Sequence, residues 1–349
     1  MKTFFRVQVP ALMLVACVLA PDARAEPKIP DRVETSGTRF LDAATLERID
    51  LGLKWLAARQ TDDGAFGVGR GYGRNVAVVS LAGLAWLSSG STPGRGEYGV
   101  PIRRAADFTL KACKSSGYIN VSEGQSHGPM YGHGFATLYL AEIYGMSPRR
   151  DVRDKLKKAT QLIIDCQNTE GGWRYENQPK EADISVTVCQ IMALRAARNC
   201  GIFVPKDTVE RCIEYVKDCQ NDDGGFRYQL VRRSRSQFAR SAAGLVALYS
   251  SGVYEGPEIT RALSFLERQR PGRFIDPHYF YGQYYAVQAM YQAGGEQWNG
   301  WFPRIRDQLL RDQGRDGSWN DSTFSNEYAT AMACIILQLP NNHLPILKR

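Results

Sequence analysis

The chain alternates between two kinds of segment in which apolar residues recur with the period of an α-helix. One kind is amphipathic, with apolar positions on one face and charged positions on the other, as in 46–59 and 209–219. The other kind is apolar on nearly every side, as in 76–87 and 184–197. Since an amphipathic helix keeps one face in water and an all-apolar helix is buried, the alternation predicts an outer layer of helices around an inner layer.

A short motif separates the two kinds of segment. It consists of Gln, then Gly four residues later, then an aromatic residue two positions further on. Glycine adopts the left-handed backbone that a tight turn requires, and the glutamine amide can cap free backbone groups. Each copy therefore predicts a turn between an outer and an inner helix. Clear copies span 60–66, 167–173, 220–226 and 313–319, and weaker copies span 114–118 and 269–274.

Six copies at intervals of 44 to 54 residues define the domain organisation. Repeats of this length are supersecondary units that bury their apolar faces against their neighbours. Twelve helices in two layers that close on themselves form an α/α toroid, so the sequence predicts an all-α fold of six helix-pair repeats. A single domain is expected over 43–349, because the repeat period does not break along the chain.

The motif carries a family resemblance. The copy Gln167-Asn-Thr-Glu-Gly171-Gly172-Trp173 resembles the prenyltransferase and squalene-oxidase repeat, which is also found in squalene–hopene cyclases and in protein prenyltransferase β subunits. The resemblance covers about 46–340, nearly the whole chain. It implies a toroid that binds an isoprenoid-like ligand in a central cavity. The fold alone does not define a reaction, because toroids host several functions.

Aligning the inner segments on their small and apolar residues predicts which side chains surround the centre. Each inner segment contributes one residue to a first ring and, one helical turn later, a polar residue to a second ring. The second ring predicts a polar wall around the centre. Its hydroxyls can instead bond to the carbonyl four residues earlier. Asp183 and His133, at equal depth in adjacent repeats, are the candidate acid–base pair. The candidate ligand contacts are Gln237, Tyr279, Tyr281, Asn326, Thr187 and Arg240. The first ring comprises Val76, His133, Asp183, Gln237, Tyr279 and Asn326, and the second comprises Ser80, Thr137, Thr187, Ser241, Gln283 and Thr330.

The catalytic motifs of the related families are only partly present in this sequence. Class II terpene cyclases use an Asp-x-Asp-Asp-Thr-Ala motif, and the matching stretch here begins at Asp183 but has Ser185 at the position of the general acid. Serine cannot protonate an alkene, so cyclisation by that mechanism is not expected. Protein prenyltransferases bind zinc, and the nearest equivalent is a set of one histidine and two carboxylates, Asp276, His278 and Glu327. Asp276 ahead of Pro277 is also typical of a helix cap. No cofactor is firmly implied.

The amino terminus has the pattern of a targeting segment. Lys2 and Arg6 precede an apolar run over 7–19, and Ala23-Arg24-Ala25 presents small residues for cleavage. The sequence therefore predicts a signal peptide at 1–25, a leader at 26–42 and a periplasmic or secreted protein. Cys17 lies in a lipoprotein-like box, so a lipid anchor is the alternative. No other stretch is apolar enough to span a membrane.

Net charge and cysteine content limit which partners and which disulfides are expected. The whole chain of 349 residues carries a formal charge of +8, and loss of residues 1–25 lowers this to +6. A charge this small does not indicate a nucleic-acid partner. An arginine-rich stretch over 227–240 is either solvated or a clamp for an anion. Among the remaining seven cysteines, Cys200 and Cys212 are the expected disulfide, since they bracket one helix connection.

The sequence therefore supports several functions. A secreted toroid with eroded catalytic motifs is expected to bind an isoprenoid-like or other ligand in its centre. One alternative is a non-catalytic toroid that binds a protein, peptide or glycan. Another is an enzyme that acts on a polysaccharide. The sequence leaves open whether the protein is an enzyme.

Overall fold

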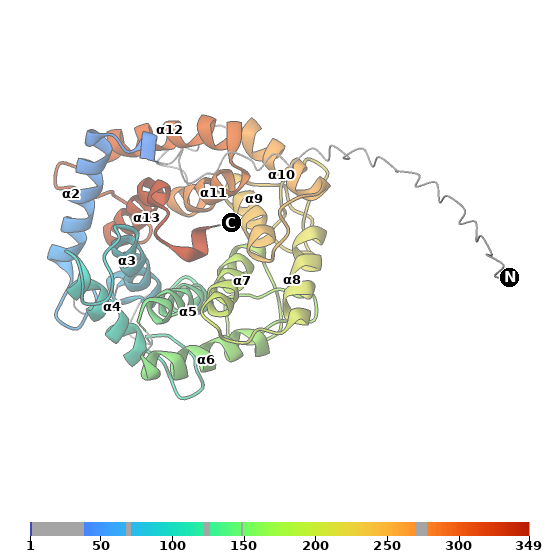
Figure 1. The fold of residues 1–349 in the computed structure, drawn as a ribbon, viewed down its shortest axis with the longest axis horizontal. Coiled ribbons are helices and arrows are strands. Elements are labelled where there is room, and N and C mark those ends of the chain that lie inside the picture. Colours follow the sequence, from blue (N-terminus) through green and yellow to red (C-terminus); the bar gives the residue numbers. More distant parts are fainter. Residues whose placement is uncertain (2–37, 68–70, 122–125, 148, 270–277, 349) are drawn as a thin grey trace. The chain divides into compact units, whose positions relative to one another are not determined.

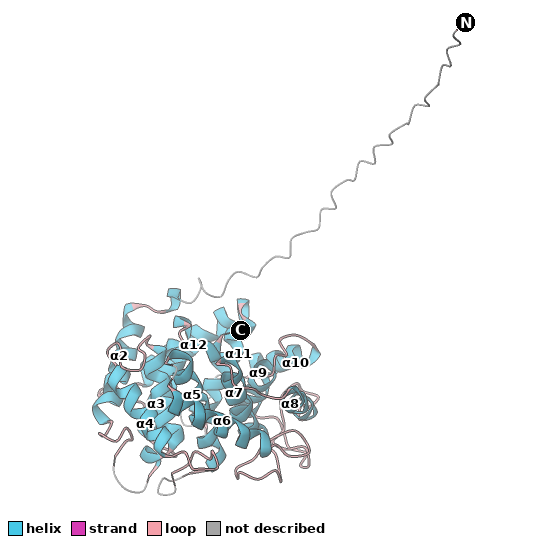
Figure 2. Cartoon of the chain, turned by 60° about the horizontal axis from the view of Figure 1, so that its bottom comes forward, coloured by secondary structure: helices cyan, strands magenta, loops and turns pink. Residues whose placement is uncertain are grey.

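The computed structural model describes Met1 and residues 38–67, 71–121, 126–147, 149–269 and 278–348. The predicted signal peptide, Cys17 and most of the predicted leader lie outside the described residues. Residues 33–349 belong to one compact unit. Its described elements are helices, turns and loops, with no β-strand among them (Figure 2). None of the described helices combines the length and the apolar composition needed to cross a membrane.

Twelve α-helices in the described residues form two concentric layers (Figure 1), which confirms the predicted all-α toroid of six helix pairs. Outer and inner helices alternate along the chain. The inner helices are α3 (Val76–Ser88), α5 (Pro129–Met146), α7 (Ile184–Asn199), α9 (Phe238–Ser250), α11 (Tyr279–Ala293) and α13 (Asn326–Gln338). The outer helices are α2 (Ala43–Arg59), α4 (Gly99–Lys111), α6 (Arg150–Asp165), α8 (Lys206–Asp218), α10 (Pro257–Arg268) and α12 (Gly295–Asp312).

The two layers have the burial that their sequences predict. In α3 every residue except Ala77 is buried, because both faces of an inner helix contact other helices. In α8 the buried residues are Thr208, Cys212, Tyr215 and Val216, which form a single stripe of helical spacing. The hydrophobic effect therefore places the apolar segments inside and leaves the polar face of each amphipathic segment in water.

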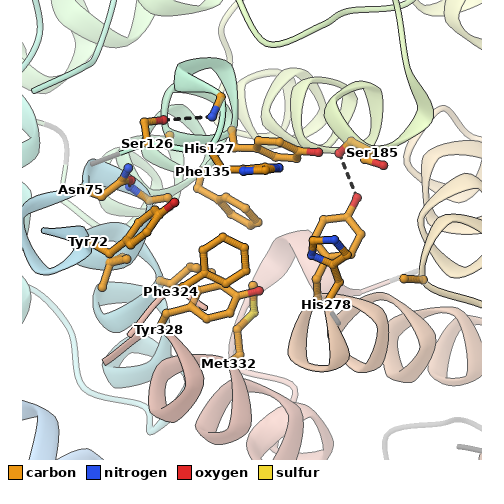
Figure 3. A pocket seen from close by; sticks show the side chains of 18 of the residues that line it. Tyr72, Asn75, Ser126, His127, Phe135, Ser185, His278, Phe324, Tyr328 and Met332 are labelled. Atoms are coloured by element: carbon orange, nitrogen blue, oxygen red, sulfur yellow. Dashed lines mark hydrogen bonds between the residues drawn. The ribbon is translucent and has the colours of Figure 1, made fainter. Parts of the chain in front are cut away.

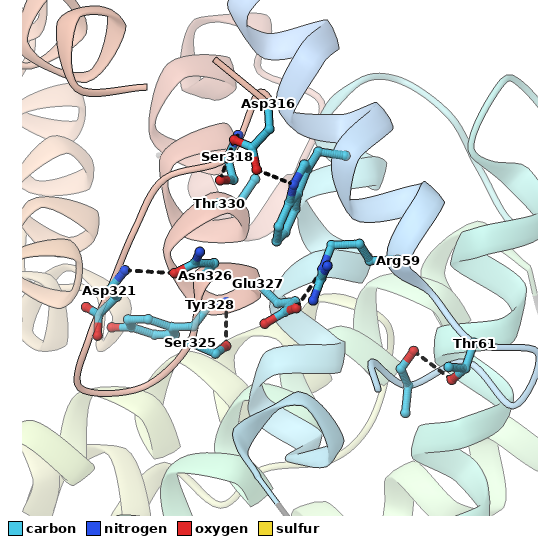
Figure 4. A network of polar contacts seen from close by, with 12 residues as sticks. Arg59, Thr61, Asp316, Ser318, Asp321, Ser325, Asn326, Glu327, Tyr328 and Thr330 are labelled. Carbon is cyan, nitrogen blue, oxygen red and sulfur yellow. Dashed lines mark hydrogen bonds and ion pairs between the residues drawn. The ribbon is translucent and has the colours of Figure 1, made fainter. Parts of the chain in front are cut away.

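The first outer helix closes the ring. α2 packs mainly against α13, the last inner helix, and α13 packs against α3. Polar contacts join the two chain ends across this closure (Figure 4): the Arg59 guanidinium lies 2.9 Å from the Glu327 carboxylate, and the Trp55 indole donates to Asp316 at 3.0 Å. The repeat units at the two ends of the sequence thus complete one another.

The repeat turns fasten each unit to the next outer helix. The Gln167 side-chain amide donates to the carbonyl of Gly171 within its own turn (2.8 Å) and to the carbonyl of Thr208 on α8 (2.9 Å). Gly171 has φ +97°, and a Cβ there would lie 2.2 Å from the Arg211 carbonyl oxygen, also on α8. Glutamines 60, 220 and 313 make the same pair of bonds, so the predicted capping role of the motif glutamine is confirmed.

The carboxy-terminal tail lies inside the ring at the ends of the inner helices. It contains two short 3₁₀ helices, η3 (Leu339–Asn341) and η4 (Pro345–Leu347). Ile346 and Leu347 are buried, and the Leu347 carbonyl accepts a hydrogen bond from Gln292 of α11 at 2.7 Å. Figure 1 shows the tail inside the ring of inner helices. The tail therefore closes one end of the central space.

The cysteines are not cross-linked in the described part of the chain. All seven described cysteines are free, so the expected Cys200–Cys212 disulfide is wrong. Cys212 is fully buried in α8, and the Cys200 thiol donates to the Ala197 carbonyl at 3.1 Å. These cysteines serve as small packing residues.

Candidate functional site

The candidate site is a pocket of about 290 Å³ at the end of the ring opposite the carboxy-terminal tail. All six inner helices contribute residues from their amino-terminal halves, so the inner helices run parallel and their amino termini meet at the pocket. The deep wall is apolar and includes Val78, Leu81, Phe135 and Met332, all buried. The mouth of the pocket thus lies at the amino ends of the inner helices, and the tail lies at their carboxy ends.

Aromatic side chains surround this mouth. Each of the six connections from an outer to an inner helix places one ring against the pocket, and these six rings are termed the aromatic rim. Figure 3 shows several of them around a common space. Five pairs of these rings are in contact, with centroids 5.3 to 6.5 Å apart. The aromatic rim consists of Tyr72, His127, Tyr175, Tyr228, His278 and Phe324.

His278 holds its place in the rim with an unusual backbone. It precedes α11 with φ 63° and ψ 26°, a left-handed conformation that few residues other than glycine adopt. Burial and the nearby His127 both lower the pKa of the His278 imidazole from its ordinary value. A strained residue of this kind is typical of functional sites.

The pocket offers few polar groups to a ligand. The Tyr281 hydroxyl donates to the Ser185 carbonyl at 2.9 Å, and the hydroxyls of Tyr175 and Tyr228 are hydrogen bonded to one another. Arg240 is the single arginine or lysine among the described lining residues, and no aspartate or glutamate is among them. The described lining therefore lacks the pair of carboxylates that glycoside hydrolysis usually employs.

Asp183 is buried close to the pocket lining. It caps the amino terminus of α7, where one carboxylate oxygen accepts the Val186 N–H at 3.0 Å. The other oxygen lies 3.9 Å from the Arg174 guanidinium. Burial raises the pKa of the Asp183 carboxyl to about 6, despite the lowering effects of the Val186 N–H and Arg174. Asp183 is absent from the lining itself, although Ser185 two residues later is part of it.

This raised pKa predicts how stability depends on pH. Since the folded chain holds the Asp183 proton more tightly than the unfolded chain, the contribution is full below about pH 4 and is lost as pH rises to about 6. The loss should be roughly 2–3 kcal/mol, at about 1.4 kcal/mol for each pKa unit. Asp183→Asn keeps a capping side chain but cannot ionise. Urea unfolding at several pH values should show the wild-type advantage over Asp183→Asn shrinking from pH 4 to pH 7; a constant difference would contradict a raised pKa.

His133, the predicted partner of Asp183, makes its hydrogen bonds outside the pocket. His133 is fully buried in α5, where its Nδ1 accepts the Ile119 N–H at 3.1 Å and its Nε2 bonds the Ala159 carbonyl at 3.2 Å. Both ring nitrogens are occupied, and burial lowers the pKa of His133 to about 4. The structure therefore does not bring His133 and Asp183 together in the pocket, and His133 joins a repeat turn to its inner helix.

Residues of the second predicted ring also join repeat turns to their inner helices. The hydroxyls of Thr187, Ser241 and Thr330 accept the backbone N–H of the motif aromatic residue in their own repeats, at distances of 2.9 to 3.1 Å. None of the six second-ring residues lines the pocket. The predicted polar wall around the pocket is therefore wrong, and three of the six polar positions satisfy buried N–H groups of the repeat turns instead.

Removal of one such hydroxyl should have a measurable cost. Thr187→Val keeps the shape of the side chain but leaves the Trp173 N–H buried without a partner. We expect a loss of about 1–3 kcal/mol of unfolding free energy, measured by urea denaturation. Thr187→Ser retains the hydroxyl and should recover most of this stability. Equal losses for the two variants would show that the methyl packing, and not the hydrogen bond, matters.

The other predicted ligand contacts divide into two groups. Gln237, Tyr281 and Arg240 line the pocket. Tyr279 is buried outside the lining, where it packs edge-to-face on Phe280 at 5.1 Å. The Asn326 side chain accepts the Asp321 N–H at 3.3 Å, also outside the lining.

The predicted zinc ligands are not brought together among the described residues. His278 belongs to the aromatic rim, whereas Glu327 is paired with Arg59 at the ring closure. Asp276 lies outside the described residues. In the part of the chain that the structure describes, no group of three His, Cys, Asp or Glu side chains could hold a metal ion. Of the two predicted ligands that the structure describes, Glu327 therefore does not share a site with His278.

Sequence reasoning missed most of the pocket. The aromatic rim residues other than His278, together with Tyr131, Phe135 and Tyr328, were not among the candidates. A signal was available, because each motif is followed by one further aromatic residue or histidine before the next inner helix. These residues stand at unequal distances after the motif, so a search for equal spacing does not detect them.

With the fold and pocket in place, comparison with known families identifies the class of protein. The family model for the prenyltransferase alpha-alpha toroid domain matches residues 35–274. The chain belongs to this family. A comparison with curated protein sequences finds no match.

Solved structures confirm the architecture. The apo type II terpene cyclase MstE from Scytonema has a TM-score of 0.58 at 15% identity, over 86% of this chain and 99% of that one. Cellobiose 2-epimerase from Bacillus thermoamylovorans reaches 0.64 at 12% identity, over 88% and 99%. An inactive alpha-1,6-mannanase of Salegentibacter reaches 0.58 at 8%, over 84% and 97%. At these identities the similarity shows the fold alone.

Proposed function

We propose that this protein binds a small isoprenoid-like ligand, with the apolar body of the ligand in this pocket. The carrying observation is the lining: an aromatic rim above an apolar wall that includes Leu81, Phe135 and Met332. Pockets of this kind bury most of a small ligand and use a few polar groups to orient it. The branched, unsaturated surface of a prenyl chain is complementary to aromatic and aliphatic side chains.

The size of the pocket limits the ligand. A volume of about 290 Å³ is near the lower end of the roughly 300–1,000 Å³ common for small-molecule pockets. This favours a ten- or fifteen-carbon chain over a longer one. Burial of such a chain at about 25 cal/mol per Å² of apolar surface supplies the driving force. In support, MstE has been solved in complex with its substrate geranylgeranyl dihydroxybenzoate, with a TM-score of 0.53 to this chain.

The second candidate ligand is a glycan. Its supporting observation is the aromatic rim, because six rings around a mouth also suit stacking against sugars. Two structural neighbours act on or bind carbohydrates by their names, the cellobiose 2-epimerase and the mannanase solved with alpha-1,6-mannotriose. The apolar wall below the rim favours the isoprenoid, since a sugar there would leave its hydroxyls without partners.

Titration calorimetry separates the two candidates. Geraniol should bind with a dissociation constant on the order of 10 μM, given its size and near-complete burial. Cellobiose and alpha-1,6-mannotriose, at millimolar concentration, should produce no heat above dilution. Native mass spectrometry of the same samples should show one geraniol per chain. Saturable sugar binding without geraniol binding would overturn the proposal in favour of the glycan.

We further propose that the protein is exported. The amino-terminal pattern around Lys2, Arg6 and Ala25 supports this assignment. Cell fractionation followed by intact-mass measurement provides the test. A mature mass that begins at Glu26 is expected, whereas a lipid-modified chain beginning at Cys17 would replace the secreted form with an anchored one.

A further inference from the structure

We propose that the ligand of this pocket carries one negative charge, as a carboxylate, and that Arg240 binds it at the mouth. This inference rests on the proposed function and adds a head group to the apolar ligand. It selects a prenyl carboxylic acid over a neutral prenyl alcohol and over a prenyl diphosphate.

The position of Arg240 is the first observation. Arg240 stands in the first turn of α9, lines the pocket and is partly buried, with its guanidinium over the Tyr228 ring at 5.5 Å. One of its terminal nitrogens donates to the Arg235 carbonyl at 3.2 Å. Its Nε is fully buried and has no partner among the described residues. The described residues therefore use only part of the hydrogen-bonding capacity of this guanidinium.

Helix electrostatics give the second observation. The amino end of a helix carries a partial positive charge, so a cation in its first turn is repelled, typically by 0.3–1 kcal/mol. Arg240 is such a cation, and the amino ends of all six inner helices meet at this pocket. The same arrangement attracts an anion, as helix amino termini commonly do. The helix field therefore acts against the arginine cation and in favour of a bound carboxylate.

The charged side chains near Arg240 determine how many negative charges the ligand can carry. Arg174 lies close by, with its guanidinium over the same Tyr228 ring, but it is already paired with Glu181 at 2.8 Å and lies near Asp183. Arg240 has no carboxylate within ion-pair distance among the described residues. One unpaired guanidinium matches one carboxylate, with which it can form two parallel hydrogen bonds. A diphosphate would bring additional charge without another free cation in the described lining and would approach the buried Asp183 carboxyl.

The test compares three probes that share one tail. Calorimetry at pH 7.5 with geraniol, geranic acid and geranyl diphosphate should give about tenfold tighter binding for geranic acid than for geraniol, the usual scale for a hydrogen bond to a charged group. Arg240→Gln should reduce this ratio to about 1. The matched control Arg232→Gln removes an equal charge from an exposed site in the loop before α9 and should keep the tenfold ratio.

Thermal unfolding tests the role of Arg240 in the absence of ligand. Because repulsion from its own helix offsets the Arg235 hydrogen bond and the Tyr228 contact, Arg240→Gln should leave the melting temperature within a few degrees of the wild type. A clear decrease would assign Arg240 a structural role and overturn the inference. Equal affinities of the wild type for geraniol and geranic acid would overturn the inference and leave the proposed function standing. Tighter binding of the diphosphate would overturn the single charge, and no binding of any probe would overturn both proposals.

Discussion

Replacing Gly171 with alanine should destabilise the protein by roughly 2–5 kcal/mol. Two costs combine at this position. The backbone has φ +97°, which costs an L-residue roughly 1–2 kcal/mol. The new Cβ would also lie 2.2 Å from the Arg211 carbonyl oxygen, so the turn and α8 must separate. Urea unfolding should show the loss, and the melting temperature should fall by several degrees or more.

Gly201 supplies a matched control for this prediction. It also has a left-handed backbone, with φ +85°, but no heavy atom lies within 4 Å of the place that a Cβ would take. Gly201→Ala should therefore cost only the backbone strain of roughly 1–2 kcal/mol. The difference between the two variants isolates the contact between a repeat turn and the next outer helix. Equal losses would mean that the turn glycines are selected for φ alone.

Filling the pocket should abolish binding without unfolding the ring. Ala77 is the one residue of α3 that is not buried, and it lines the pocket. An indole there occupies space that the ligand requires, in a pocket of only about 290 Å³. Ala77→Trp should weaken geraniol binding by at least about a hundredfold, or roughly 2.7 kcal/mol, as measured by calorimetry.

The control for Ala77→Trp places the same side chain on the surface. Val231 is 76% exposed and does not line the pocket, so Val231→Trp should bind geraniol as the wild type does. Both variants should melt within a few degrees of the wild type, because neither adds volume to the packed core. Retained affinity in Ala77→Trp would place the ligand outside this pocket.

The sequence predicts the fold of this protein more completely than its site. The motif Gln and Gly were sufficient to place the turns, because each has a local requirement, a left-handed backbone or a nearby carbonyl. The orientation of Thr187 was not predictable in this way. A hydroxyl in an inner helix can face the central space or the turn, and only the position of the Trp173 N–H decides between them.

His133 illustrates the same limit. Its sequence position suggests a cavity residue, and alignment placed it level with Asp183. In the folded chain it takes the role that Thr187 has in the next repeat, where it accepts the N–H of Ile119 in the less regular turn of its own repeat. A shift of one helical turn in the alignment of α5 moves a side chain along the helix axis, away from the pocket level, while the hydrophobic pattern remains satisfied.

The sequence by itself determined the helices, their assignment to two layers and the six-fold repeat, because helical periodicity and glycine turns depend on residues close together in the chain. The tertiary structure alone decided which side chains share the pocket. The aromatic rim draws Tyr72 and Phe324 together from opposite ends of the repeat array, with ring centroids 5.3 Å apart. That contact exists only because α2 packs against α13, and ring closure is a long-range event that no local pattern encodes.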